Sequence, residues 1–184
     1  LSSFDIINKK TKVDIKKNSL IDNRIIINNI GIILLVRTNS ERLKDKALLK
    51  INGKETITYL IERLKLSKLS NKIILATSSY KSDDSLINIA KKQNIYFFRG
   101  SSENVISRIY GAAKKFKLDH IVRVTGDDIL RDYEMIDHLI DKHLQGSFDV
   151  TMSKKMPYGT STEVMSIDVV ETVYKKIKDA KNSE

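Results

Sequence analysis

Short apolar runs alternate along the chain with longer segments in which apolar residues recur every three or four positions. The run Ile30–Val36 shows no alternation of polar and apolar positions, which is typical of a strand buried on both faces. The segment 57–66 places Ile57, Leu60 and Leu64 on one side, as in an amphipathic helix. These patterns predict strands at 30–36, 72–76, 95–98, 120–124 and 148–152, and helices at 57–66, 82–93, 102–116, 133–144 and 168–178.

The alternation of strands and helices predicts a fold built from parallel strand–helix–strand units. Such units place helices on both faces of one sheet, so we expect a three-layer α/β architecture with a mostly parallel sheet. A chain of 184 residues is long enough to bury one large core and too short for two. The sequence contains no internal repeat and no low-complexity linker.

The first predicted strand stops abruptly at a polar, basic loop. Arg37, Ser40, Arg42 and Lys46 follow it within ten residues. In an open α/β sheet, ligands bind beyond the carboxyl ends of the strands. Cationic side chains and loop N–H groups at that place suit a polyphosphate, whose oxygens accept charge-assisted hydrogen bonds. From these residues alone, an ordinary strand followed by a solvated, lysine-rich loop is an equally good interpretation.

A second polar motif follows the strand at 120–124 and reads Arg-Val-Thr-Gly-Asp-Asp-Ile-Leu-Arg-Asp from Arg123 to Asp132. Its first two carboxylates, Asp127 and Asp128, are expected at the carboxyl edge of the sheet, beside the basic loop. Carboxylate oxygens together with phosphates are the usual ligands of Mg²⁺ in proteins. The alternative is an acidic turn that caps the next helix, and we assign this capping role to Asp132.

The basic loop resembles the nucleotide-binding signature of the sugar cytidylyltransferases, most closely the branch that serves spore-coat polysaccharide. That branch reads A-R-M-G-S-T-R-L-P-G-K where this chain reads V-R-T-N-S-E-R-L-K-D-K from 36 to 46. Asn39 replaces a glycine, a mild change because asparagine tolerates left-handed backbone. Lys44 and Asp45 replace Pro-Gly, which leaves the path of the loop open. The positions that match are Arg37, Ser40, Arg42, Leu43 and Lys46.

Other segments agree with this family in order and spacing from residue 31 to about 170. The second motif is similar to R-I-T-A-D-C-P-L-I-D, which puts the family's metal-binding aspartate on Asp127 and a small residue at the position of Asp128. Weaker matches are Ala-Thr-Ser at 76–78, Phe-Arg-Gly-Ser at 98–101 and a segment ending on Arg108.

One departure lies near the end of the family's core, where P-R-G-L-D-V-E-V-F-S is expected. Ser161 replaces the aspartate of that segment, and serine is a poor ligand for Mg²⁺. Either Glu163 or Asp128 would then complete the metal site, or one metal position is lost. It is equally possible from the sequence that Glu163 is a structural residue of a strand and has no role at the metal.

The resemblance implies a Rossmann-like αβα nucleotidyltransferase of the nucleotide-diphospho-sugar transferase type. It implies transfer of CMP from CTP to an acidic sugar, release of pyrophosphate and Mg²⁺ as cofactor. A Kdo-type or uridylyl-type transferase and a non-catalytic nucleotide-binding module are the alternatives. The expected catalytic residues are Arg37, Lys46 and Asp127; the nucleotide-binding residues are Arg37, Ser40, Arg42, Lys46, Ala76, Thr77, Ser78, Arg99 and Thr125; the sugar-binding residues are Arg108 and Glu163; and the metal ligands are Asp127, Asp128 and Glu163.

Residues 1–28 do not continue the pattern of this domain. The stretch from Asp5 to Ile21 resembles the closing segment of the antifreeze-like domain that ends sialic acid synthases, and a basic linker is the alternative. We therefore expect a boundary near residue 28 and a cytidylyltransferase domain at 29–184 that lacks a C-terminal portion. Fusion to an upstream synthase would make the sugar a nonulosonic acid such as sialic, legionaminic or pseudaminic acid.

The net charge of +10 raises the question of nucleic-acid binding. The lysines are dispersed over helices that also carry acids, and no basic stripe contains interleaved aromatics, so nucleic acid is not expected as a partner. Cysteine is absent, no apolar run approaches the ~20 residues of a membrane span, and the beginning of the chain does not resemble a signal peptide. We expect a cytoplasmic enzyme without membrane association, and the resemblance allows a homodimer. His120, His138 and His143 match no zinc spacing and are interpreted as structural or surface residues.

Overall fold

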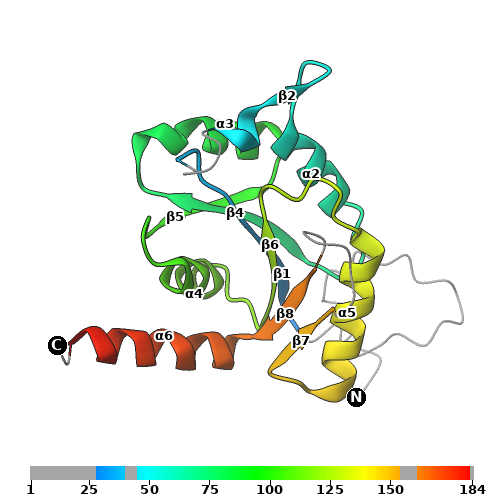
Figure 1. Ribbon diagram of the computed structural model, residues 1–184. Coiled ribbons are helices and arrows are strands. Elements are labelled where there is room, and N and C mark those ends of the chain that lie inside the picture. Colours follow the sequence, from blue (N-terminus) through cyan, green and yellow to red (C-terminus); the bar gives the residue numbers. More distant parts are fainter. Residues whose placement is uncertain (1–27, 40–44, 154–160, 183–184) are drawn as a thin grey trace, which may run out of the picture.

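A six-stranded sheet with the strand order β5-β4-β1-β6-β8-β7 forms the centre of the protein (Figure 1). The structure is a computed structural model that describes residues 28–39, 45–153 and 161–182. The strands of this sheet are β1 (Ile30–Leu35), β4 (Lys72–Ser78), β5 (Tyr96–Gly100), β6 (His120–Thr125), β7 (Val150–Met152) and β8 (Glu163–Ser166). The predicted boundary near residue 28 cannot be compared with a structure, because residues 1–27 lie outside the described ranges.

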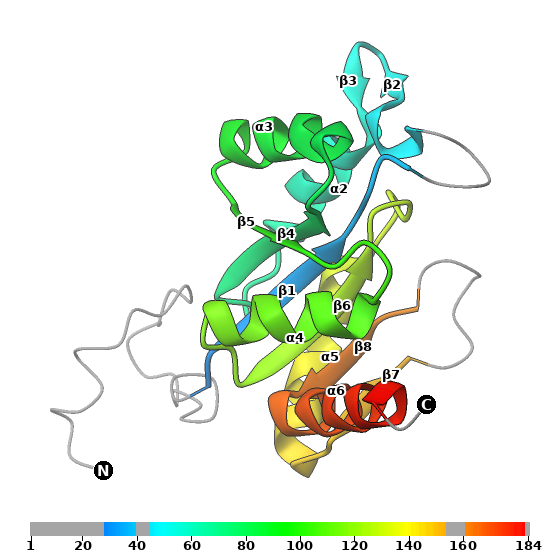
Figure 2. The ribbon, with the colours of Figure 1, turned by 90° about the vertical axis from the view of Figure 1, so that its left-hand side faces the viewer.

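Helices cover both faces of this sheet, as predicted. Two short 3₁₀ helices, η1 (Lys46–Leu48) and η2 (Lys81–Asp83), accompany them. The α-helices are α2 (Thr56–Leu64), α3 (Asp84–Lys92), α4 (Val105–Lys115), α5 (Tyr133–Gly146) and α6 (Ile167–Asn182). Residues of α2, α3 and α5 share one buried cluster, and residues of α4 and α6 share the other. Figure 2 shows α4 and α6 in front of the sheet, so the three-layer αβα prediction is confirmed.

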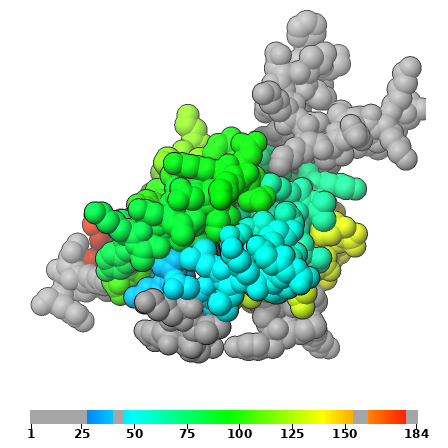
Figure 3. All heavy atoms as spheres, turned by 90° about the horizontal axis from the view of Figure 1, so that it is seen from above, coloured from blue at the N-terminus to red at the C-terminus, as the bar shows by residue number. Residues whose placement is uncertain are grey.

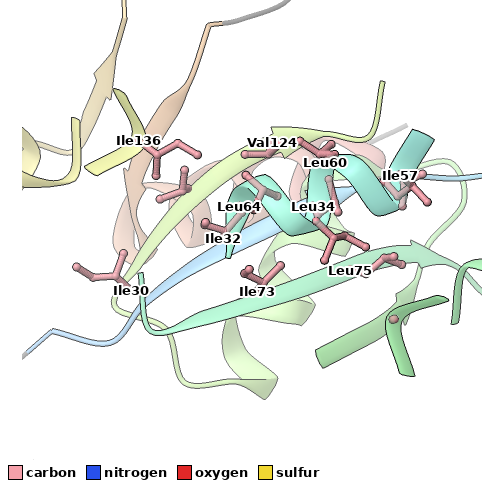
Figure 4. Close-up of a cluster of buried hydrophobic side chains, with 14 of the residues drawn as sticks. Ile30, Ile32, Leu34, Ile57, Leu60, Leu64, Ile73, Leu75, Val124 and Ile136 are labelled. Carbon is pink, nitrogen blue, oxygen red and sulfur yellow. The ribbon is translucent and has the colours of Figure 1, made fainter. Parts of the chain in front are cut away.

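Every residue of β1 is buried, because the strand lies in the middle of the sheet between the two helical layers. Ile30, Ile32 and Leu34 belong to the cluster formed with α2, α3 and α5, and Figure 4 shows Ile32 close to Leu64 and Leu34 close to Leu60. The alternate side chains of β1 pack against α4 and α6. The unbroken apolar run in the sequence reflects burial on both faces.

The sheet is mostly parallel, as predicted, but its β8–β7 side is not. β1 pairs in parallel with β4 and β6, and β4 pairs in parallel with β5. β8 runs antiparallel to β6, and β7 runs antiparallel to β8. The strand predicted at 148–152 is shorter in the structure, where β7 spans 150–152. It pairs with β8, a strand that we did not predict.

A second element that the sequence pattern did not reveal is the hairpin of β2 (Lys50–Ile51) and β3 (Lys54–Glu55). Its strands have two residues each, too short for any periodicity. Its turn is Asn52-Gly53, and both residues have positive φ angles, 50° and 80°, as an Asn-Gly hairpin turn requires. Seen from above, the hairpin and α2 (cyan) lie beside α3 (green) (Figure 3).

Two helix starts are fixed by side-chain caps. Asp132 accepts hydrogen bonds from the backbone N–H groups of Glu134 (2.9 Å) and Met135 (3.3 Å), so its predicted capping role is confirmed. Asn104 accepts from the N–H of Ser107 at 2.8 Å, so α4 begins three residues later than predicted. Among the described residues, no helix is long and apolar enough to cross a membrane.

Candidate active site

The carboxyl ends of β1 and β6 and the beginning of α4 enclose a cavity of about 350 Å³. This is the place where an open α/β sheet is expected to bind its ligand. Four of its lining side chains are cationic and one is anionic. The lining residues are Leu35, Val36, Arg37, Lys46, Ala47, Val105, Arg108, Arg123, Thr125, Gly126 and Asp127.

Gly126 allows the loop after β6 to approach the end of β1. A Cβ atom at this position would lie 2.7 Å from Cβ of Val36, closer than real Cβ atoms come. The backbone N–H of Gly126 donates to the carbonyl oxygen of Leu35 at 2.9 Å. This close contact brings the second polar motif against the first, and so places Asp127 on the cavity.

The two described ends of the basic loop lie together: the N–H of Asp45 donates to the carbonyl oxygen of Thr38, three residues after β1, at 3.0 Å. Asp45 has a φ angle of 53°, in the left-handed region, which explains why the related signature has glycine here. The hydroxyl of Thr56, at the start of α2, donates to the carbonyl oxygen of Lys46 at 3.0 Å. These contacts hold Lys46 at the mouth of the cavity.

Lys46 and Asp127 form an ion pair across the cavity, with Nζ 2.6 Å from Oδ2. Their side chains are 29% and 43% exposed, so both can reach a ligand. Burial by itself would raise the pKa of Asp127, but hydrogen bonds, first from Lys46 and then from Thr125, hold that pKa below its usual value. Asp127 is therefore a carboxylate at neutral pH.

Two arginines meet at the beginning of α4. Arg37 donates from Nη1 to the carbonyl oxygen of Ser102 at 3.1 Å, and Arg108 donates from Nη1 to that of Ser101 at 2.7 Å. Arg108 is only 4% exposed and, within the described residues, it forms no ion pair, and its buried Nε has no hydrogen-bond partner. Burial, and then the charge of Arg37, lower the pKa of Arg108. A buried cation without a bound anion is unfavourable, so this corner of the cavity favours an anionic ligand.

A third arginine, Arg123, also lines the cavity. Arg123 on β6 faces Glu163 on β8 across the antiparallel ladder. Its Nη1 donates to Oε2 of Glu163 at 2.7 Å, and the two side chains are 36% and 27% exposed. Glu163 is thus engaged by an arginine.

The carboxylate of Asp83 connects the segment that follows β1 to the end of β4 through hydrogen bonds. Asp83 is 1% exposed and accepts from the N–H and hydroxyl of Thr38 at 2.8 and 2.7 Å, and from the hydroxyl of Thr77 at 2.7 Å. The N–H and the hydroxyl of Ser78 also donate to it. Burial by itself would raise the pKa of Asp83, but these hydrogen bonds outweigh it and hold the pKa below its usual value. The first residues of the basic loop are thereby tied to β4.

Asp128 lies away from the cavity lining, in a buried pair with Arg131 in which Oδ2 and Nη2 are 2.7 Å apart. Arg131 also donates to the carbonyl oxygen of Ser161 and to the hydroxyl of Thr162, so it links the 126–132 loop to the beginning of β8. Burial raises the pKa of Asp128, although Arg131 opposes the shift. Asp128 is therefore less well suited than Asp127 to bind a cation in the cavity.

The structure brings together part of the predicted site. Arg37, Lys46, Arg108, Thr125 and Asp127 line the cavity. Ser40 and Arg42 lie outside the described residues. Among the described residues no three of the acidic and histidine side chains form a metal cluster, so Asp127, Asp128 and Glu163 are not gathered around one point.

The remaining predicted nucleotide-binding residues lie beside the cavity. Ala76, Thr77 and Ser78 are buried at the end of β4, and both hydroxyls donate to Asp83. Arg99 pairs with Asp84 and is not in the lining. His120 and His143, interpreted as structural or surface residues, contact each other, with Nδ1 and Nε2 3.1 Å apart.

Sequence reasoning missed the roles of Arg123 and Asp83. Arg123 precedes the acidic motif on the same strand, and its position two residues before Thr125 could have placed it on the same face. Asp83 lies at the start of the helix predicted at 82–93, and the sequence suggests no other role for it. Its contact with Thr38, 45 residues away, has no signal in a single sequence.

The comparison with protein families decides the identity of the domain. Residues 31–184 match the model of the family described as "Cytidylyltransferase". The chain belongs to the cytidylyltransferase family. The prediction made from the two polar motifs is confirmed.

Similar proteins place the chain within this family. An uncharacterized protein of Methanocaldococcus jannaschii is 39% identical over 150 residues, which cover 82% of this chain and 61% of that protein. The spore coat polysaccharide biosynthesis protein SpsF of Bacillus subtilis is 30% identical over 148 residues, which cover 78% of this chain and 62% of that protein. The chain thus spans about three fifths of the length of these relatives.

Solved structures agree with the fold. A cytidylyltransferase from Leptospira borgpetersenii superposes with a TM-score of 0.77 at 31% identity, covering 80% of this chain and 64% of that one. A CMP:2-keto-3-deoxy-manno-octonic acid synthetase complexed with CTP superposes with a TM-score of 0.66 at 15% identity, covering 80% and 78%. At that identity the second likeness concerns the fold alone.

Proposed function

We propose that this cytidylyltransferase transfers CMP from CTP to an acidic sugar and releases pyrophosphate, in the synthesis of a surface polysaccharide. Family membership supports the nucleotidyl transfer, and the likeness to a spore coat polysaccharide biosynthesis protein supports the pathway class. Because the reaction consumes CTP, we place it in the cytoplasm.

The excess of positive charge in the cavity carries this proposal. Arg37, Lys46, Arg108 and Arg123 line it together with a single carboxylate, that of Asp127. Arg108 is buried without an ion-pair partner in the described part of the chain. The triphosphate of CTP would supply the missing anion, and guanidinium groups bind phosphate oxygens with paired hydrogen bonds.

The phosphates would lie between the basic loop and the beginning of α4. Arg37 and Arg108 would bind them from the α4 side, where the helix dipole also favours negative charge. Arg108, which we predicted to bind the sugar, is thus proposed as a phosphate ligand instead. Lys46 would exchange Asp127 for a phosphate oxygen and neutralise charge on the departing pyrophosphate. We retain Ser40 and Arg42 as further phosphate ligands. Ala76, Thr77, Ser78, Arg99 and Thr125 are retained as the surroundings of the nucleoside and ribose.

Asp127 fits the role of a Mg²⁺ ligand. It is ionised, partly exposed and on the cavity, and one carboxylate plus phosphate oxygens is a common way to hold this ion. When bound, Mg²⁺ would neutralise the triphosphate and polarise its phosphorus–oxygen bonds. We do not propose Asp128 or Glu163 as further ligands, because neither side chain is in the cavity lining.

The chain's own contribution is positioning and electrostatic stabilisation, which dominate phosphoryl-type transfers. The hydroxyl of the sugar attacks the α-phosphorus of CTP, the bond to the bridging oxygen breaks, and pyrophosphate leaves. The proton of the hydroxyl passes to solvent. No nucleophilic side chain is required.

For the sugar we propose a nonulosonic acid, on the basis of the N-terminal resemblance to a sialic acid synthase segment. A synthase joined to the transferase would raise the concentration of its product at the second site. Turnover of the eight-carbon acid of lipopolysaccharide, with none of any nine-carbon acid, would refute this choice.

Mg²⁺-dependent pyrophosphate release tests the activity. We expect release with CTP and an acidic sugar, and much slower release with UTP. Faster release with UTP would favour a uridylyltransferase. Tight CTP binding without release, across a panel of sugar acids, would favour a non-catalytic nucleotide-binding module.

A further inference from the structure

We propose that Arg123 recognises the carboxylate of the acidic sugar and that Glu163 is its positioning residue. This inference rests on the proposed function and deepens it, because it assigns the sugar-specific charge of the cavity to one side chain. The sequence motifs gave Arg123 no role. Glu163 was expected to contact the sugar or a metal.

Arg123 lines the cavity from a position two residues before the carboxyl end of β6. Arg123 and Thr125 both line the cavity, whereas Val122 and Val124 point into the opposite core. The rise of a strand puts the Cα atom of Arg123 about 7 Å behind that of Thr125, and Asp127 lies two residues further along. The guanidinium therefore faces the region next to the phosphates, where an acceptor sugar would sit.

The donors of Arg123 are only partly used. Glu163 is the one side chain of the described residues that accepts a hydrogen bond from it, through Nη1. A guanidinium has five N–H donors in a planar fork. The rest of the fork matches the two oxygens of a carboxylate.

The pairing of β6 with β8 positions the guanidinium of Arg123. Arg123 and Glu163 are direct partners in the β6–β8 ladder. β8 is itself held by Arg131, which donates to the hydroxyl of Thr162 at 3.0 Å. A side chain anchored in this way loses little freedom when a ligand binds.

The chemistry of the substrate calls for a cation at this place. In an ulosonic acid the carboxyl group and the reacting hydroxyl are on the same carbon, so the carboxylate must approach the α-phosphate. Two anions at that distance repel each other, and a cation between or beside them offsets the repulsion. The proposed function uses Arg37, Lys46 and Arg108 as phosphate ligands, which leaves Arg123, the fourth cation of the lining, for the carboxylate.

The test uses Arg123→Gln, Arg123→Lys and Glu163→Gln, with Lys175→Gln as the control. Lys175 pairs with Glu171 on the surface of α6 and does not line the cavity, so its substitution removes a cation outside the proposed site. Each variant is assayed with CTP, Mg²⁺ and either the sugar acid or its carboxamide. CTP binding without sugar and the melting temperature are measured in parallel.

We expect Arg123→Gln to lower kcat/KM for the acid by about 100-fold or more, while the rate with the carboxamide and the affinity for CTP change by less than about threefold. Arg123→Lys should recover part of the loss, and Glu163→Gln should cause a smaller loss, of about tenfold. The control should behave as the unsubstituted protein.

Three outcomes would overturn the inference while leaving the proposed function intact. The first is unchanged turnover of the acid by Arg123→Gln. The second is an equal loss with acid and carboxamide, which indicates a structural role. The third is a parallel loss of CTP affinity, which places Arg123 on the phosphates. Absence of turnover by the unsubstituted protein with every sugar acid would instead refute the proposed function, and this inference with it.

Discussion

Replacing Asp83 by Asn should loosen the basic loop that follows β1 without changing any residue that lines the cavity. Asp83 does not line the cavity, yet it accepts hydrogen bonds from Thr38, Thr77 and Ser78. One oxygen binds Thr38, and the other binds Thr77 and Ser78. Asparagine keeps the shape of the side chain and one acceptor oxygen. Its N–H₂ group, however, would replace the second oxygen and face groups that donate hydrogen bonds to that oxygen in the wild-type protein.

The size of the effect follows from the bonds that the amide cannot replace. The hydroxyls of Thr77 and Ser78 can rotate and accept from the amide, whereas the N–H of Ser78, now 3.1 Å from the carboxylate, cannot. A hydrogen bond to a charged group contributes about 1.5–3 kcal/mol, and a buried donor left without a partner costs about 1–3 kcal/mol. We therefore expect a loss of about 3 kcal/mol in the free energy of unfolding, or roughly 6–12 °C in melting temperature.

The assay combines thermal melting with CTP binding. Asp84→Asn is the matched control, because Asp84 is the next residue, is 60% exposed and pairs only with Arg99 among the described residues. We expect its melting temperature to change by less than about 2 °C. Asp83→Asn should also weaken CTP binding by about tenfold at a temperature where it is folded, because Thr38 begins the loop. Equal melting temperatures for the two variants would refute the reasoning.

Three further predictions concern charge. Lys46→Ala should weaken CTP binding by about 10- to 100-fold while the melting temperature stays the same, because Lys46 is partly exposed and outside the core; unchanged binding at low salt would make it a surface lysine. Asp127→Asn should abolish Mg²⁺-dependent turnover and leave nucleotide affinity within an order of magnitude; normal turnover at limiting Mg²⁺ would exclude it as the ligand. Burial, and then His120, lower the pKa of His143 to about 4. Because His143 is protonated more easily when unfolded, its contribution to stability is complete above the unfolded pKa of about 6.5 and is lost as the pH falls from there toward 4. His143→Gln should reduce the change of melting temperature with pH over this window, and an unchanged pH dependence would contradict the assignment.

Most of the central fold could be predicted because burial leaves a direct signature in the sequence. β1 is buried on both faces and reads as an apolar run, and the helices show their buried side at helical spacing. The β2–β3 hairpin and β8 have two to four residues each, so hydrophobic periodicity cannot reveal them. The antiparallel direction of β8 depends on where the chain returns, which no local pattern encodes.

The candidate site divides in the same way. Residues in continuous motifs, such as Arg37, Lys46 and Asp127, could be predicted to lie together because the ends of parallel strands meet at one edge. Asp83 and Arg123 act through partners 40 or more residues away, Thr38 and Glu163, so their roles required the fold. The arginine pairing of Asp128 and Glu163 likewise has no signal in the sequence. Of the three predicted metal ligands, Asp127 is the one that lines the cavity and the one that we propose.

We propose that this cavity is the place where CMP is joined to an acidic sugar. The most direct measurement is pyrophosphate release by the protein with CTP, Mg²⁺ and a panel of sugar acids, together with mass spectrometry of the product. We expect stoichiometric release of pyrophosphate and formation of a CMP-sugar with at least one acid, and neither when Mg²⁺ is removed. Binding of CTP with no CMP-sugar formed from any acid in the panel would contradict it.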